Sequence, residues 1–301
     1  MSTPAADDGL ELTLLAGDDE GHDAELVVDE GSPWFDGHFP GHPVLPAIAQ
    51  IEVAARLHRA AGERGYLAGV DALRFSEPVR PGDRLRVRLG ACDEHGRGRL
   101  RLTRAGDGVE IGSGTLIWGS PTADEVRDPP EVEEIGEAVP AELPHAGPSR
   151  LLEAAVAVGS GQTIGHGRVP AAHAAAHDGR VPALLAVELA APAAAQVPQV
   201  QEAGGERGAE AGTGEAAGGG AGTGGGEAGG GSPHGRRLGY LVRLRDVRFA
   251  RTEIEVDAPL VAHVDLAGRT GPLARFDFVV ALPTGEPIAG GSLATWEVVE
   301  D

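Results

Sequence analysis

The stretch FDGHFPGHPVLPAIAQIE, Phe35 to Glu52, decides the fold of this chain. Its first half surrounds His38 with prolines and glycines, and the run that follows Pro46 contains neither residue. Proline restricts φ and removes a backbone donor, so the first half predicts a stiff loop. The later residues are apolar nearly all round, which predicts a buried helix over Ala47–Ala60. Its carboxylate, Glu52, follows the loop histidine by 14 residues.

The second half of the chain repeats this pattern. VPALLAVELAA resembles LPAIAQIEVAA, with Glu188 matching Glu52 at an offset of 136 residues, whereas Tyr240 matches Tyr66 at an offset of 174. The two offsets differ by 38 residues, about the length of a Gly/Ala/Glu-rich stretch at about 199–236. Without large apolar residues this stretch cannot offset its ordering entropy, so we expect a disordered insertion. The matches therefore predict an internal repeat with one inserted loop.

The repeat divides the chain into residues 1–122, an acidic proline-rich linker at 123–142, and residues 143–301. Prolines and like charges predict that the linker is extended and solvated. Each repeat reads as a strand pair, one helix (the second over Ala183–Gln196) and three or four further strands with alternating polarity. This order predicts an α+β fold in which each antiparallel sheet wraps around one central helix.

Composition excludes several classes of function. The formal net charge of −21 argues against nucleic acid as a partner. No apolar run approaches the roughly 20 residues that span a bilayer, and the N-terminus lacks a secretory pattern, so we expect no membrane partner and a cytoplasmic location. Eleven histidines without metal-ligand spacing predict no metal site. The single cysteine, Cys92, falls in a strand-like stretch and is expected to pack, not to act as a nucleophile.

The segment GHFPGHPVLPAIAQIE resembles the helix entry of the hotdog-fold 3-hydroxyacyl-[acyl-carrier-protein] dehydratases of fatty-acid synthesis, and ALRFSEPVRPGD, from Ala72, resembles their next strand and turn. LPHAGPSRLLEAA, from Leu143, resembles a divergent branch that includes dehydratase-like partners of aryl-polyene-type pathways. The resemblance implies a double hotdog that converts carrier-bound (3R)-3-hydroxyacyl thioesters to trans-2-enoyl thioesters. It also implies an acyl carrier protein as partner, no cofactor beyond the carrier's phosphopantetheine, and possible further self-association.

Dehydration needs a base for the C2 proton, an acid for the departing hydroxyl and donors to the thioester oxygen. His38 is the expected base, because imidazole titrates near neutrality. A glutamate on the buried helix is the expected acid, because burial raises a carboxyl pKa. The expected oxyanion and substrate-binding residues are Ala47, whose amide begins the helix, with Gly41, Pro46 and Phe39.

Repeat two lacks a histidine at the position that matches His38. Ala174 stands 14 residues before Glu188, and its neighbours His173 and His177 have the wrong spacing. Pro192 falls inside the expected second helix and should kink or shorten it. In the resembled family the histidine and the acidic residue come from different hotdogs, which implies the pair His38 with Glu188. Glu52 would then belong to a vestigial second site, although the residues alone leave open which glutamate pairs with His38.

A basic run, Arg236 to Arg251, stands out in this acidic chain and predicts a solvated edge or outer face, or a dock for an acidic carrier. The candidate docking residues are Arg56, Arg59, Arg64, Arg243 and Arg245. Two other functions remain as alternatives, namely a hotdog thioesterase and a catalytically silent acyl-binding partner. The eroded second repeat and Ala47, where the family has glycine, keep the silent partner open, whereas the proline-rich histidine loop argues against a thioesterase.

Overall fold

The computed structural model describes residues 8–131, 138–141, 143–158, 161–197 and 236–300. Repeat one contains six strands and one long helix in the expected order. Its elements are β1 (Leu10–Leu14), β2 (Gly21–Val28), the 3-10 turn η1 (Pro33–Phe35), α1 (Ala47–Ala60), β3 (Tyr66–Phe75), β4 (Arg84–Gly90), β5 (Arg97–Arg104) and β6 (Glu110–Gly119).

The connector and repeat two follow with a similar pattern and several short additions. Their elements are η2 (Ala123–Glu125), β7 (Val139–Pro140), η3 (Gly147–Ser149), β8 (Leu152–Val158), β9 (Gln162–Gly167), β10 (Arg180–Pro182), α2 (Leu185–Ala195), β11 (Arg236–Phe249), β12 (Glu253–Glu255), β13 (Leu260–Thr270), β14 (Leu273–Ala281) and β15 (Pro287–Glu300). β10 and β12 pair with each other and close the loop that precedes α2.

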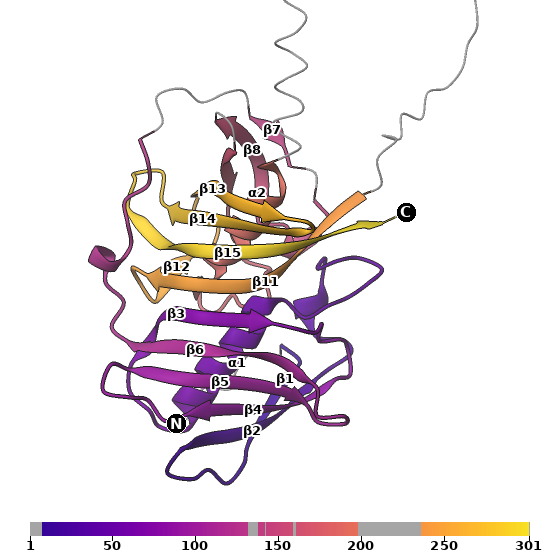
Figure 1. Cartoon of the computed structure of the whole chain (residues 1–301), viewed down its shortest axis with the longest axis vertical. Helices are drawn as coiled ribbons and strands as arrows, with labels where there is room; N and C mark the ends of the chain where they lie inside the picture. Colours follow the sequence, from indigo (N-terminus) through magenta and orange to yellow (C-terminus); the bar gives the residue numbers. More distant parts are fainter. Residues whose placement is uncertain (1–7, 132–137, 142, 159–160, 198–235, 301) are drawn as a thin grey trace, which may run out of the picture.

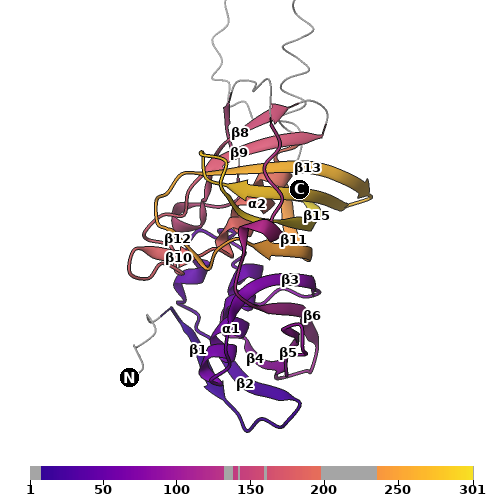
Figure 2. The same ribbon diagram turned by 90° about the vertical axis from the view of Figure 1, so that its left-hand side faces the viewer.

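The two repeats share one antiparallel sheet. Its strand order is β1-β2-β4-β5-β6-β3-β11-β15-β14-β13-β9-β8-β7, so β3 and β11 form the seam. Figure 1 shows these two strands side by side at the middle of the molecule. Leaving aside the edge strand β7, the order from β8 to β11 mirrors the order from β1 to β3, which is the expected duplication. Each half curves around its own helix, and α1 and α2 lie on the same side of the sheet (Figure 2). The chain is thus a double hotdog.

The helix α1 has the bounds that the sequence predicts. Pro46 is its N-cap, with ψ of 141°, and Gly62, at φ 80°, follows its C-cap and donates its amide to the Arg59 carbonyl. A glycine suits this position because other residues avoid positive φ. Ten of the 14 helix residues are buried, including the polar Gln50 and Glu52. Burial on nearly every face brings these polar side chains into the interior, where each needs a partner or a function.

The helix α2 is shorter than expected and begins two residues late. Ala183 remains outside it because its amide donates to the carbonyl of Thr252 (2.9 Å), in continuation of the β10–β12 pair. Pro192 lies inside the helix. It provides no amide for the carbonyl of Glu188 one turn earlier, which weakens the hydrogen bonding of this helix.

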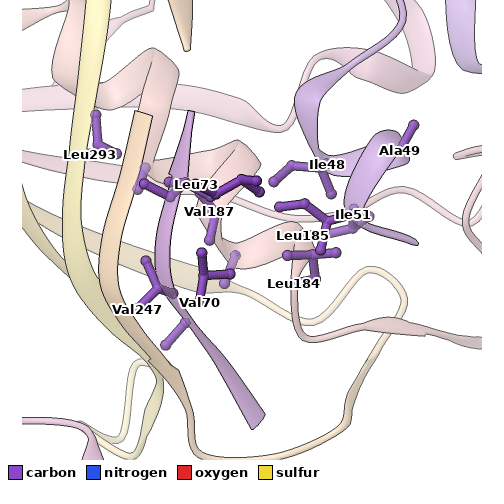
Figure 3. Packing of buried hydrophobic residues seen from close by; sticks show 14 of the residues in the cluster. Ile48, Ala49, Ile51, Val70, Leu73, Leu184, Leu185, Val187, Val247 and Leu293 are labelled. Carbon is purple, nitrogen blue, oxygen red and sulfur yellow. The ribbon is translucent and has the colours of Figure 1, made fainter. Parts of the chain in front are cut away.

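A continuous apolar core joins the repeats beneath the seam. Figure 3 shows Ile48 and Ile51 of α1 close to Leu185 of α2, with Leu73 of β3 and Val247 of β11 on the sheet side. All five side chains are at most 1% exposed. Because both helices pack on this shared core, the start of α1 and the first turn of α2 are held close together.

Two expectations about the surface need correction, and a third becomes more specific. The linker is not fully solvated: Val126 is buried and lies against Gly290, and β7 extends the sheet. Cys92 follows β4 and is exposed, so it does not pack in a strand. For the basic run, the outer face is the one of the two expected positions that the structure shows, because β11 pairs on both sides and Arg243 and Arg245 are exposed.

The expected insertion at about 199–236 lies almost wholly outside the described residues. Among the helices that the structure describes, none combines the length and apolar character needed to cross a bilayer.

Candidate active site

The loop before α1 fixes His38 by a backbone contact. Nδ1 of the ring lies 2.6 Å from the carbonyl oxygen of Val44, and a carbonyl can only accept, so Nδ1 carries the hydrogen. In the neutral ring the lone pair is therefore on Nε2. The residue is 6% exposed, and Phe39 beside it has a φ of 53°. This uncommon conformation for a residue other than glycine marks a constrained loop.

Glu188, in the first turn of α2, faces this base from the other repeat. Its Oε1 lies 3.5 Å from Nε2 of His38. Burial acts to raise the pKa of Glu188, but the hydrogen bond and charge of His38, with smaller contributions from His145 and His173, lower it overall. The expected rise of the carboxyl pKa by burial is therefore wrong for this residue. Glu188 is thus placed to stabilise the charge that His38 gains when Nε2 takes a proton.

Glu52 lies elsewhere, in a network of ion pairs. Its Oε1 is 2.9 Å from Arg59 and 3.6 Å from Arg56. Arg56 in turn binds the buried carboxylate of Asp8, which also accepts from the indole of Trp34 (2.9 Å). Glu52 does not line the cavity that holds His38. The ion pairs of Glu52 indicate a structural role. They also engage Arg56 and Arg59, two of the arginines expected to bind a carrier.

His145 is the site residue that the sequence analysis missed. The amide of Ala146 donates to the carbonyl of Gly37 (2.8 Å), and Ser149 Oγ donates to the carbonyl of Asp36 (2.7 Å). These bonds join the start of repeat two to the histidine loop and place the two imidazole centroids 5.0 Å apart. The available signal was compositional, because PHAGP, like GHFPG, surrounds a histidine with proline and glycine.

One ligand atom each from His38, His145 and Glu188 lies within 4.8 Å of the other two. Two imidazoles and a carboxylate are a donor set that zinc accepts. The prediction of no metal site rested on spacing along the chain, and three distant segments build this cluster. The same atoms are also suited to proton transfer.

A cavity of about 410 Å³ contains this cluster. Of the four expected oxyanion and substrate-binding residues, Ala47 and Phe39 line it, whereas Gly41 and Pro46 do not. As the first helical residue, Ala47 has an amide without an intrahelical acceptor, whereas the corresponding amide of Ala183 is bonded to Thr252. Of these two matching alanines, Ala47 is therefore the one whose amide is open to a substrate oxygen.

Further polar side chains line the same cavity. Gln50 is 3% exposed, and its Oε1 has no hydrogen-bond partner within the described residues. The ring of Tyr240 stacks on Phe39 with centroids 4.8 Å apart. His42 and Arg80 line the cavity and are also exposed, so they mark where it reaches the surface.

The remaining residues that the sequence singled out lie outside the cavity. His173 is buried beside Trp34, with ring centroids 5.5 Å apart, and burial lowers its pKa to about 4. It lies near Glu188 but does not line the cavity. His177 is exposed and 3.1 Å from Asp178. None of the five arginines expected to dock a carrier lines the cavity.

Comparison with known proteins agrees with this architecture. Over 104 residues the chain is 37% identical to the 3-hydroxyacyl-[acyl-carrier-protein] dehydratase FabZ of Roseiflexus castenholzii, covering 31% of this chain and 72% of the relative. The chain belongs to the FabZ dehydratase family. The FabZ of Caldicellulosiruptor saccharolyticus is 32% identical over 111 residues, covering 33% and 79%. The FabZ of Syntrophomonas wolfei is 42% identical over 84 residues, covering 25% and 57%. The chain thus spans between about half and four fifths of these relatives' length.

Residues 16–114 match the model of a protein family described as ApeI-like, ApeI dehydratase. Two solved structures are similar over nearly the whole chain. The first comes from a study of substrate modification by dehydratases from type I polyketide synthases; it superimposes with a TM-score of 0.64 at 12% identity, covering 96% of this chain and 99% of the other. The dehydratase domain of PpsC from Mycobacterium tuberculosis, in complex with C12:1-CoA, gives 0.60 at 12% identity, covering 95% and 97%. At these identities the likeness shows the double hotdog fold.

Proposed function

We propose that this protein dehydrates (3R)-3-hydroxyacyl thioesters to trans-2-enoyl thioesters at one site built from both repeats. The observation that carries the proposal is the approach of Nε2 of His38 to Glu188 inside a cavity that also contains the first amide of α1. This elimination needs a base, an acid group that can pass a proton to the hydroxyl, and a donor to the thioester oxygen, and His38, Glu188 and the Ala47 amide suit these three roles.

In the proposed reaction, Nε2 of His38 takes the C2 proton. Negative charge then develops on the thioester oxygen, where the Ala47 amide and the positive end of the 14-residue helix stabilise it. Glu188 stabilises the imidazolium as it forms. The C3–O bond breaks on the same face, which gives syn elimination. The departing hydroxyl needs a proton, and Glu188 passes on to it the one that it receives from the His38 imidazolium, so that water leaves.

The proposed substrate is carried on the phosphopantetheine of an acyl carrier protein, and no other cofactor is proposed. The exposed cavity residues His42 and Arg80 suit the approach of an acidic carrier better than Arg243 and Arg245, which lie on the outer face of the sheet away from the helices. The docking role predicted for those two arginines is therefore replaced by one for Arg80.

The test is turnover of carrier-bound and pantetheine-bound 3-hydroxyacyl substrates of several chain lengths, followed at the enoyl absorbance, with free thiol measured in parallel. We expect enoyl product from the wild type and none above background from His38→Ala. Release of thiol without enoyl would indicate a thioesterase instead. Saturable acyl binding without either product would indicate a silent partner.

A further inference from the structure

We propose that His38, His145 and Glu188 form a reversible zinc site, and that zinc bound there inhibits the protein by occupying its base. The inhibitory effect rests on the proposed dehydratase function, whereas binding of the ion is measurable without any reaction. One ligand atom from each of the three side chains lies within 4.8 Å of the other two. Within the part of the chain that the structure describes, no other group of three histidine, cysteine or acidic side chains gathers in this way.

The separation of His38 and Glu188 matches one edge of a zinc coordination tetrahedron. Zinc binds imidazole nitrogen and carboxylate oxygen at about 2.0–2.2 Å, so two ligand atoms of a tetrahedral site lie about 3.4 Å apart. Nε2 of His38 and Oε1 of Glu188 are 3.5 Å apart. Because no pair of ligand atoms exceeds 4.8 Å, the His145 atom reaches the third position by a shift of about 1.5 Å at most.

The hydrogen bond of His38 fixes the tautomer that a metal ligand requires. Its Nδ1 lies 2.6 Å from the carbonyl oxygen of Val44 and donates to it, so in the neutral ring Nε2 presents the lone pair. Metal-bound imidazoles are usually oriented by such a bond from the second ring nitrogen to a carbonyl or carboxylate oxygen. Zinc displaces any protons that the three ligand atoms carry, so the site requires no particular charge state beforehand.

Backbone contacts hold His145 beside this pair. The bond from the Ala146 amide to the Gly37 carbonyl (2.8 Å) joins the segments that carry the two histidines. A Cβ on Gly37, built at its φ of 77°, would lie 1.7 Å from the Ala146 carbonyl oxygen, so glycine is required for this approach. Phe39 packs against both imidazoles, with centroids at 4.7 and 4.9 Å. The cavity that the three ligands line leaves the fourth coordination position to water.

Bound zinc stops the proposed reaction at its first step. Coordination takes the lone pair of Nε2 of His38 that would accept the C2 proton. It also takes the Glu188 oxygen that would stabilise the imidazolium and pass the proton on. A chelator that removes the ion restores both groups. Zinc is thus an inhibitor of this site and not a cofactor of the reaction.

The first experiment measures binding, by calorimetric titration of zinc chloride into chelator-treated protein without an affinity tag. We expect one tight site per chain in the wild type. His145→Gln and Glu188→Gln should each weaken it by at least about 10-fold, because loss of an outer-shell partner alone costs about 10–100-fold in metal affinity. His177→Gln, at an exposed histidine 3.1 Å from Asp178, is the matched control and should bind zinc like the wild type.

The second experiment follows dehydration of a 3-hydroxyacyl pantetheine as zinc is added, with the occupancy known from the titration. The rate of the wild type should fall in proportion to occupancy and return when the chelator EDTA is added. His177→Gln should be inhibited at the same zinc concentrations. Magnesium at those concentrations should not inhibit, because it prefers oxygen ligands in octahedral geometry.

A wild type without a tight site, or equal zinc affinity in the wild type and the cluster variants, would overturn the inference. Undiminished or increased turnover at full occupancy would overturn it as well. Circular dichroism establishes that each variant is folded, and His145→Asn provides a second test if His145→Gln is not. A chelator-treated wild type that forms no enoyl product from any 3-hydroxyacyl thioester would instead reject the proposed function, and the titration would then decide the metal site alone.

Discussion

His38 Nε2 and Glu188 Oε1 lie 3.5 Å apart, although one residue belongs to the loop of repeat one and the other to the helix of repeat two. Each repeat provides part of the site. Repeat one provides the histidine loop and an unused helix amide, and repeat two provides the carboxylate and His145. Because Glu52 is bound by arginines and Ala174 replaces a second histidine, the described residues assemble one such site.

The two glutamates should therefore respond differently to the same substitution. We expect Glu188→Gln to lower kcat by at least about 100-fold, because the amide cannot stabilise the His38 imidazolium. Glu52→Gln should retain kcat within about threefold of the wild type, since it lies outside the cavity. Steady-state dehydration assays on the two purified variants measure this. The composite site would be rejected if only Glu52→Gln lost activity.

Gly37→Ala should disrupt the contact between the repeats. The new methyl group would meet the Ala146 carbonyl at 1.7 Å, and the backbone φ of 77° disfavours alanine. We expect a loss of about 2–4 kcal/mol in the free energy of unfolding in urea, together with reduced kcat. The matched control is Gly41→Ala, which has a φ of 91° but no atom within 4 Å of the new Cβ. A similar loss in both variants would attribute the effect to backbone strain alone.

Arg56→Met should destabilise the fold without a direct effect on the chemistry. Arg56 lies between Asp8 and Glu52, and both carboxylates are buried. Removal of one partner from a buried ion network typically costs about 3–5 kcal/mol, because a charge is left uncompensated. Urea unfolding measures the loss, and Arg64→Met, at an exposed position, is the control. Equal stability of the two variants would show that solvent compensates these carboxylates.

The sequence was sufficient for the duplicated fold because its signals are local or repeated. The loop and the bounds of α1 follow from proline and glycine placement and from apolar periodicity, and the offset of Glu188 revealed the second hotdog. The location of His145 could not be derived in this way, since it depends on one backbone bond between Gly37 and the start of repeat two. The sign of the Glu188 pKa shift was also out of reach, because it depends on three histidines from different segments.

Arg80→Ala tests where a carrier approaches. Arg80 is exposed and lines the cavity, so its loss should raise KM for a carrier-bound substrate severalfold and leave KM for the pantetheine substrate unchanged. The effect should weaken at high salt, because exposed charges are screened. Arg243→Ala, on the outer face, should change neither KM. An effect of Arg243→Ala alone would move the docking surface to the seam strands.

His173 should make the stability of the protein fall as the pH is lowered. Burial holds the folded-state pKa at about 4, below the ordinary value of 6.5. Above pH 6.5 the ring is neutral in both states and contributes no pH dependence. Between pH 6.5 and 4 the unfolded chain binds a proton that the folded chain does not, so the free energy of unfolding falls. The full loss is about 3 kcal/mol, complete below the folded pKa.

Other groups titrate in the same window, so the prediction concerns the difference between two proteins. In the wild type, Nδ1 of His173 accepts the Ala175 amide (3.1 Å), and the side-chain oxygen of asparagine can accept the same bond. His173→Asn should therefore lose less stability between pH 7 and 4 than the wild type, by up to about 3 kcal/mol. Urea unfolding at each pH gives both curves. The lost contact with Trp34 lowers the free energy of unfolding of the variant equally at every pH. A difference between the two curves that does not change with pH would therefore mean that His173 has the same pKa in the folded and unfolded protein.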